Sequence, residues 1–393
     1  MRVLSRPHGS VHELTARMGL LHFRCGVSCI LLAVAVLTGG CQSSAGPEAL
    51  ESVKADPGAG SSAPVVASQS FGSGPARIDI FLDSSIAGSA NDYRDGAALA
   101  IKELGAGQLT LAAHDLRAPG VVVADEVKQS ADGGTKMLIG PPSLAKAFAD
   151  ASSKPPAMLL DANPVASAVA IQSDEIGGAI EIASYAAGAG RTKIMVVSTR
   201  PLDMAETQRL RAGLKKNGVQ LLDIVTDPTS ADGVAKLARL GEAQAVLLIG
   251  ADAPKVAAPA LRQRGGLEAS VPFLGTYVWP ASAYGEPVLE GSLLALIDQN
   301  SLKRISGRFQ QTYGRALSLE AAYGFDAVAV AAGIVRTKGA DGLKPTALRA
   351  SSGFTGATGT FRFGADGHVE RRLAIYRLSG GKLVLQDAAP SGF

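Results

Sequence analysis

The chain has 393 residues, which is enough for two α/β domains of ordinary size. Hydrophobic residues make up 47% of it, a globular composition that excludes a disordered chain. Residues 1–40 hold four arginines and one acid, so the remainder is neutral, with 34 basic and 34 acidic residues. A neutral body with dispersed charge argues against nucleic acid as a partner.

The N-terminal region contains a short apolar segment, residues 25–40, that follows Arg17 and Arg24. It is too short for a membrane-spanning helix and ends in small residues directly before Cys41. This arrangement resembles the lipobox of bacterial lipoproteins, in which the signal peptide is cleaved before a cysteine that then carries diacylglycerol. The resemblance implies a signal peptide over residues 1–40, with Met1 or Met18 as its start, and lipidation at Cys41. The alternatives are an ordinary secretory signal with an accidental cysteine, or a buried apolar helix.

Cleavage at this position would leave Cys41 as the last of the three cysteines. We therefore expect no internal disulfide and no cysteine-based metal site. Gly, Ser, Ala and Pro dominate residues 42–75, so residues 41–75 are predicted to be a lipidated cysteine and a flexible linker. The predicted location is the periplasm, anchored to a membrane. Gln42 stands where enterobacterial lipoproteins of the inner membrane carry Asp, which favours the outer membrane.

From residue 77 onward, short apolar runs alternate with helical patterns in two successive series. The first series predicts strands over residues 78–83, 109–115, 137–140 and 157–161, with helices over 92–104, 121–130 and from 143. The second series predicts strands over residues 194–198, 219–225, 245–250 and 271–275, with helices over 204–216, 234–240 and 254–264. The strands are continuous apolar runs, as in parallel sheets buried on both faces, so the two series predict two lobes.

Residues 356–385 follow a different pattern, in which apolar and polar residues alternate. Turn sequences stand at Asp366-Gly367 and Gly380-Gly381. This pattern predicts β-hairpins at the end of the chain.

Four segments carry a family resemblance over residues 76–393. They are RDGAALAIKEL (94–104), MLIGPPS (137–143), YGFDAVAVAAGI (323–334) and GATGTFRFGADGHVERRLAIYRL (356–378). Their order and spacing resemble the type I periplasmic binding proteins, specifically the leucine/isoleucine/valine-binding family. The resemblance implies a two-lobed α/β fold in which each lobe is a mostly parallel sheet flanked by helices.

The resemblance also implies three hinge crossings between the lobes, near Gln172, near residues 290–299 and near Gly356. The first lobe would comprise residues 76–171 and 291–355, and the second lobe residues 172–290 and 356–393. Two lobes joined in this way can close over a ligand by rigid rotation.

Ligands of parallel sheets bind beyond the carboxyl ends of the strands, so the loops there supply the candidate site. The candidate ligand-binding residues are Ser84, Ser85, Pro142, Ser143, Asp161, Asn163, Thr199, Thr276, Tyr277 and Trp279. Ser143 could hold an anion or could serve only as a helix N-cap. Trp279, the only tryptophan, could line the cleft or could be a packing residue.

Catalytic patterns are absent from the sequence. There is no G-x-S-x-G nucleophile elbow, no H-E-x-x-H and no P-loop. His114-Asp115 is a conceivable catalytic pair, but solvation at a loop edge is the simpler interpretation. We therefore expect no enzyme activity, no cofactor and no metal.

Two non-enzymatic functions are compatible with the sequence. The first is a receptor that captures a small polar solute, an amino acid or a derivative, and delivers it to the permease of an ABC importer. The second is an activator of a peptidoglycan synthase, a penicillin-binding protein. It follows from three segments (273–295, 309–333 and 385–393) that are similar to the alphaproteobacterial penicillin-binding protein activator lipoproteins.

Overall fold

The computed structural model describes residues 68–85, 88–151, 153–165, 167–228, 230–263 and 266–393. The predicted signal peptide, Cys41 and most of the predicted linker lie outside these residues. The linker prediction was wrong for strand β1 (Ser68–Gly72), which pairs antiparallel with β3 (Leu109–Asp115). β1 is a short, largely polar edge strand that is held by backbone pairing, so it lacks the apolar run that marks a buried strand.

The first sheet has six strands in the order β1-β3-β2-β4-β5-β6. All strands except β1 run parallel to one another. In addition to β3 they are β2 (Ala76–Leu82), β4 (Met137–Gly140), β5 (Ala157–Leu159) and β6 (Ala168–Ala170). β2 and β3 are buried along almost their whole length, because helices cover both faces of the sheet.

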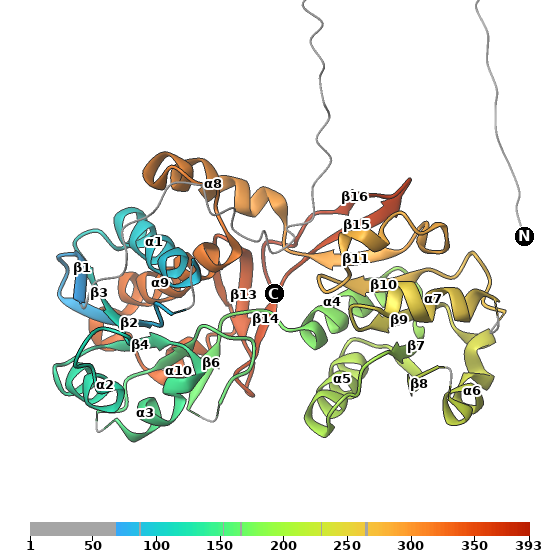
Figure 1. The fold of residues 1–393 in the computed structure, drawn as a ribbon, viewed down its shortest axis with the longest axis horizontal. Helices are drawn as coiled ribbons and strands as arrows, with labels where there is room; N and C mark the ends of the chain where they lie inside the picture. The colour runs from blue at the N-terminus through green and yellow to red at the C-terminus, as the bar shows by residue number, and fades with distance from the viewer. Residues whose placement is uncertain (1–67, 86–87, 152, 166, 229, 264–265) are drawn as a thin grey trace, which may run out of the picture. The chain divides into compact units, whose positions relative to one another are not determined.

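Each face of the first sheet has its own set of helices (Figure 1). One face shares a core with α1 (Ser89–Ala100), the π-helical turn η1 (Ile101–Gly105), α8 (Gln299–Tyr313), α9 (Leu319–Lys338) and α10 (Pro345–Leu348). The other face packs against α2 (Val123–Asp132), the turn η2 (Pro142–Leu144) and α3 (Ala145–Asp150). α8, α9 and α10 begin 129 residues or more after the end of β6, the last strand of this sheet, so they share a core with α1 only because the chain returns to the first sheet.

Glycines allow the backbones of α1 and α9 to come into direct contact. A Cβ atom at Gly96 would lie 1.8 Å from the carbonyl oxygen of Ala321, and one at Gly324 would lie 2.2 Å from that of Tyr93. No side chain fits at either position, so this contact requires both glycines.

The second sheet has seven strands in the order β16-β15-β11-β10-β9-β7-β8. The parallel strands are β7 (Lys193–Ser198), β8 (Gln220–Thr226), β9 (Ala245–Ile249), β10 (Phe273–Thr276) and β11 (Leu293–Leu296). The hairpin β15 (Ala374–Ser379) and β16 (Lys382–Asp387) adds two antiparallel strands at the edge beside β11.

Helices cover both faces of the second sheet as well. α4 (Glu175–Gly188) and α5 (Met204–Lys216) pack on one face, and α7 (Ala253–Gln263) with the turn η3 (Leu237–Glu242) packs on the other. The remaining short elements are α6 (Ala231–Lys236), η4 (Ala281–Ala283), η5 (Pro287–Leu289) and η6 (Ala340–Gly342). Two mostly parallel sheets flanked by helices confirm the predicted fold class. In the described part of the chain, no helix is both long and apolar enough to cross a membrane.

The chain passes between the two sheets three times, but at positions that differ in part from the predicted ones. The first passage, between β6 and α4, contains Gln172. The second follows β11, which pairs in the second sheet, so residues 293–296 do not belong with the first sheet. The third follows β14, since β12 (Phe354–Gly356), β13 (Gly359–Phe363) and β14 (Val369–Arg371) contribute to the core of the first sheet. The alternating sequence pattern of these strands does not indicate which of the two cores they pack against.

A buried ion pair lies where these passages meet the first sheet. Arg371 Nη1 is 3.4 Å from Asp326 Oδ2, and both side chains are almost completely buried. Arg371 also donates to the carbonyl oxygen of Ile171 (2.8 Å) and to Ser173 Oγ (3.0 Å). Asp326 accepts from the backbone N–H of Ala357 (2.5 Å) and from Thr358. Burial raises the pKa of Asp326, and the positive charge of Arg371 opposes that effect.

Replacing Arg371 with Met should lower the free energy of unfolding by about 3–5 kcal/mol, because it leaves the Asp326 carboxylate buried without its partner. Chemical denaturation measures this change. Arg377→Met is the matched control, because Arg377 is exposed on β15 and should change stability by no more than about 0.5 kcal/mol. Equal effects of the two substitutions would contradict the role given to Arg371.

Candidate functional site

The predicted site residues lie at the carboxyl ends of parallel strands in both sheets. In the first sheet they follow β2, β4 and β5, and in the second sheet they follow β7 and β10. Within a parallel sheet these ends share one edge, so each sheet gathers its own set of polar loops.

The loop after β2 is held by carboxylates of the first sheet. Asp83 accepts from the backbone N–H of Ser85 (3.0 Å) and from its hydroxyl (2.5 Å). Arg117 donates two bonds of 2.8 Å to Asp83 and holds the pKa of that carboxyl well below its ordinary value. Asp115 accepts from the backbone N–H groups of Ser84 and Arg117. Sequence reasoning missed Arg117, which lies in the turn after β3.

The loop after β5 is fixed in a similar way. Asp161 accepts from the backbone N–H of Asn163 (2.7 Å) and from its side-chain amide (3.2 Å). Gln172, further along, donates to the hydroxyl of Tyr93 (2.6 Å) and to the carbonyl of Leu160 (3.0 Å). Gln172 is therefore anchored to the first sheet.

Pro142 and Ser143 are exposed in the turn η2, after β4. The N-cap alternative for Ser143 is wrong, because Pro141 precedes η2, Leu144 precedes α3, and neither turn nor helix has a side-chain cap. The Ser143 hydroxyl makes no hydrogen bond within the described chain, so it is free to meet solvent or a ligand.

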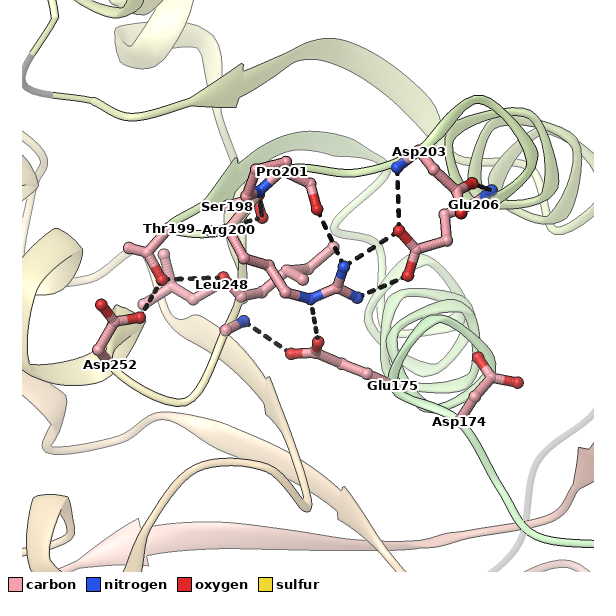
Figure 2. A network of polar contacts seen from close by, with 12 residues as sticks. Asp174, Glu175, Ser198, Thr199, Arg200, Pro201, Asp203, Glu206, Leu248 and Asp252 are labelled. Atoms are coloured by element: carbon pink, nitrogen blue, oxygen red, sulfur yellow. Dashed lines mark hydrogen bonds and ion pairs between the residues drawn. The ribbon is translucent and has the colours of Figure 1, made fainter. Parts of the chain in front are cut away.

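An arginine between two glutamates dominates the corresponding edge of the second sheet, as Figure 2 shows. Arg200 Nε donates to Glu175 Oε2 (3.0 Å), and its two terminal nitrogens donate to the oxygens of Glu206 (3.0 and 2.8 Å). Glu175 Oε1 accepts from the backbone N–H of Gly250 (2.7 Å). Glu206 raises the pKa of Arg200, and Arg200 in turn lowers that of Glu206.

Sequence reasoning missed this arginine–glutamate network. Asp203 and Glu206 form a capping box at the start of α5, and Asp174 caps α4 directly before Glu175. The D-x-x-E spacing was a readable signal for the start of α5. The ion pairs themselves could not be predicted from the sequence, because they join residues of three separate elements.

Thr199, Thr276 and Tyr277 complete this edge of the second sheet. Thr199 donates to Asp252 and, at 3.4 Å, to the carbonyl of Ile249 (Figure 2). Thr276 is completely buried, and its Oγ1 has no hydrogen-bond partner in the described chain. Tyr277 is 48% exposed, and its hydroxyl donates to the carbonyl of Ser173 at 3.2 Å.

Trp279 lies in the core of the second sheet and not at its surface. It is 2% exposed, its Nε1 lies 3.4 Å from the carbonyl oxygen of Leu248, and its ring covers Gly275. These contacts describe a packing residue. The cleft-lining interpretation of Trp279 is not supported by its placement.

His114 does not pair with Asp115. Its Nε2 lies 3.1 Å from Asp79 Oδ2, and its Nδ1 lies 2.7 Å from Glu126 Oε1. Arg77 and Ser130 also donate to Asp79, and the imidazole ring stacks on Phe81. Two carboxylates facing both ring nitrogens require the imidazolium form. Desolvation lowers the pKa of His114, but Asp79 and Glu126 outweigh it and raise the pKa.

Two surface depressions lie elsewhere, beside α8. The larger, of about 500 Å³, is lined by Leu99, Lys102, Glu103, Arg308, Gln311 and Thr312. Its position argues against its being the site, because its lining residues share neither sheet edge with the anchored polar loops. Among the described residues, no group of three or more His, Asp or Glu side chains is placed to hold a metal ion.

The pH dependence of stability should show the charge on His114. Its folded pKa lies above the value of about 6.5 in the unfolded chain. The stabilisation is therefore complete below about pH 6.5 and is lost as the pH rises through the folded pKa. The difference in unfolding free energy between wild type and His114→Gln should shrink between pH 6 and pH 9. A difference that grows with pH would refute the imidazolium assignment.

Replacing Thr276 with Val should raise the free energy of unfolding by about 1 kcal/mol, since it removes a buried hydroxyl that has no partner within the described chain. Thr360→Val is the control, because the Thr360 hydroxyl donates to the carbonyl of Ser391 and its loss should destabilise the chain. Denaturation curves of both variants measure the effect. Destabilisation by Thr276→Val would show that its hydroxyl is satisfied.

Comparisons with known proteins support the fold. No protein-family model matches the sequence, and no curated protein matches it. Solved structures do match. A putative branched-chain amino acid ABC transporter protein from Rhodospirillum rubrum has a TM-score of 0.61 at 18% identity, over 79% of this chain and 99% of that one. A branched-chain amino acid ABC transporter periplasmic ligand-binding protein from Burkholderia xenovorans has a TM-score of 0.55 at 14% identity, over 80% and 96%.

A third solved structure, an ABC transporter substrate-binding protein from Desulfitobacterium hafniense in complex with Leu, has a TM-score of 0.50 at 16% identity, over 79% of this chain and 99% of that one. At these identities the likeness concerns the fold and not the ligand. Together with the two helix-covered sheets, it shows that the chain has the fold of the type I periplasmic binding proteins.

Proposed function

We propose that the chain is a non-enzymatic extracytoplasmic receptor for a small polar solute, an amino acid or a derivative, of the kind that serves an ABC importer. The observation that carries this proposal is the placement of anchored polar loops at the carboxyl edges of two separate sheets joined by three short passages. Such loops are preorganised for binding, and short passages permit rotation of one sheet against the other.

The passages themselves support a hinge. In the first, Gln172 is anchored to the first sheet, whereas Asp174 caps α4 of the second. In the second, Ile297 packs against the cores of both sheets. In the third, Arg371 is buried against the first sheet, and Arg372 reaches Glu181 of α4. In the first and third passages the anchoring thus changes from one sheet to the other within one or two residues, so we place pivots there and a third at Ile297.

The lobes of the receptor follow from these pivots. The first lobe would comprise residues 68–172 and 298–371, and the second lobe residues 174–296 and 372–393. Lipidation at Cys41 would hold both lobes at the periplasmic face of a membrane. Gln42, the residue that follows this cysteine, favours the outer membrane. The partner that takes over the solute would then be an ABC permease.

The absence of catalysis in this proposal rests on how the reactive side chains are used. His114 is committed to Asp79 and Glu126 beneath the loop edge. The carboxylates Asp83 and Glu175 are each paired with an arginine. Groups held in this way orient loops and are not free to transfer protons to a ligand.

A thermal-shift screen of residues 42–393 tests the receptor function, since all four hydrophobic cores of the described chain lie within this segment. Amino acids and their derivatives should include at least one solute that raises the melting temperature. A solute at a hundred times its Kd should stabilise the fold by about 2.7 kcal/mol. No shift with any solute, together with retention of a penicillin-binding protein from membrane extracts, would contradict the receptor and favour the synthase activator.

A further inference from the structure

The tail, residues 388–393, returns from the second lobe to the first. It follows the hairpin β15–β16 of the second sheet, and Ala389 packs against the core of that sheet. Two residues later, the carbonyl of Ser391 accepts a hydrogen bond of 3.2 Å from the hydroxyl of Thr360. Thr360 belongs to β13, which contributes to the core of the first sheet, and the C-terminus lies beside this strand (Figure 1). The tail therefore crosses between the lobes at Pro390.

Two arginines hold the aromatic ring of Phe393 at the first lobe. The guanidinium carbons of Arg362 and Arg372 lie 4.2 and 4.5 Å from the centroid of this ring, at the distance of a cation–π contact. Arg372 Nε also donates to the carbonyl of Gly392 (3.1 Å). Arg362, on β13, is itself fixed by two hydrogen bonds to Glu370 (2.8 and 2.6 Å). The ring thus rests on cations that the protein already holds in place.

The tail reaches the third passage at its pivot. The backbone N–H of Arg372 donates to the carbonyl of Thr360 (2.9 Å), so the backbone of Arg372 is tied to β13 of the first lobe. Leu373, the next residue, packs in the core of the second sheet. The side chain of Arg372 also lies 3.5 Å from Glu181 of α4. Gly392 and Phe393 therefore contact the residue at which the chain turns from one lobe to the other.

The tail has little slack at its crossing. Pro390 alone separates Ala389 of the second core from Ser391 at the first lobe, and two residues span at most about 7 Å. The proline ring also fixes the backbone angle φ at this position. A rotation that moves β16 away from β13 must therefore pull Ser391 and Phe393 out of their contacts.

These contacts can be released without disturbing a core. Phe393 is 37% exposed, and Pro390, Ser391 and Gly392 are exposed as well. Cation–π contacts at exposed sites are individually weak. Several of them together can bias an equilibrium between two orientations of the lobes and still allow the second orientation to form.

The orientation that the tail accompanies is an open one. At the edge of the first sheet, Ser85 and Ser143 are exposed. At the edge of the second sheet, Met204 is 77% exposed and Tyr277 is 48% exposed. Lobes that had closed over a solute would cover side chains at these edges. The contacts of the tail therefore exist while both polar edges face solvent.

We propose that residues 388–393 form a strap that holds the two lobes in the open arrangement and releases the first lobe when they close. Phe393 is its main positioning residue, because its ring joins Arg362 of β13 to Arg372 at the pivot. The inference rests on the hinge of the proposed receptor, but it does not depend on which solute binds.

Distances between spin labels, measured without solute, test the strap on residues 42–393, which contain no cysteine. Gln129→Cys on α2 and Arg211→Cys on α5 report the distance between the lobes. Ending the chain after Ala389 should make this distance distribution about twofold broader, because open and closed arrangements are then both populated. The distribution between Gln129→Cys and Gln311→Cys, both in the first lobe, should not change. An unchanged distribution between the lobes of the folded, shortened chain would overturn the strap.

Phe393→Ala tests the ring contacts in a chain of full length. It should broaden the same distribution, and Leu385→Ala, an exposed apolar position on β16, is the matched control that should not. Equal distributions in the two variants would overturn the role of Phe393. If the shortened chain does not fold, Phe393→Ala still decides the inference. The measurement uses no solute, so its failure is distinct from a failure of the receptor function in the thermal-shift screen.

Discussion

The ion pair between Arg371 and Asp326 is the interaction on which the arrangement of the chain depends. It lies in the core of the first sheet, yet its hydrogen bonds reach the first passage at Ile171 and Ser173 and the backbone at Ala357. A buried charge pair adds little stability over well-packed apolar residues, but it imposes strict geometry on every group that bonds to it. Here that geometry fixes where two of the three passages leave the first sheet.

In the first and third passages, the contacts of the chain change from one lobe to the other within one or two residues. Arg371 and Arg372 are consecutive, but the first is buried beside α9 and the second reaches Glu181 of α4. On the two sides of Ser173, Gln172 bonds to the first lobe and Asp174 caps α4 of the second lobe. In the proposed rotation the backbone turns at these positions, and the two lobes keep their internal loops intact. The polar loops around Asp83 and around Arg200 would each move with their lobe and keep their internal hydrogen bonds.

Sequence patterns predicted most of the secondary structure, because a strand that is buried on both faces of its sheet has a continuous run of apolar residues. β3, β4 and α5 have the predicted bounds. β1 was not predicted, because an exposed edge strand needs no apolar run. Residues 356–371 were assigned to the wrong core, because an alternating pattern does not indicate which core a strand packs against. The loops of the candidate site were predictable from strand ends, since parallel topology fixes their common edge.

The chemistry within those loops was not predictable. Arg200 and Glu175 are 25 residues apart, and Glu175 and Gly250 are 75 apart, so their meeting depends on how α4 lies on the second sheet. His114 illustrates the same limit: Asp115 is its neighbour in sequence, but β2 brings Asp79 to it and α2 brings Glu126. Trp279 follows a strand end as a ligand-binding residue would, and only the packing of its ring over Gly275 identifies its role.

We propose that one lobe rotates against the other when a solute binds, and distances between spin labels measure this rotation. Residues 42–393 contain no cysteine, so labels can be placed by Gln129→Cys on α2 of the first lobe and Arg211→Cys on α5 of the second, both exposed positions. A pair within the first lobe, Gln129→Cys and Gln311→Cys on α8, provides the reference. With a saturating solute, the distance between lobes should change while the reference distance stays constant. A bound solute that leaves the distance between lobes unchanged, or that changes the reference distance, would contradict the hinge.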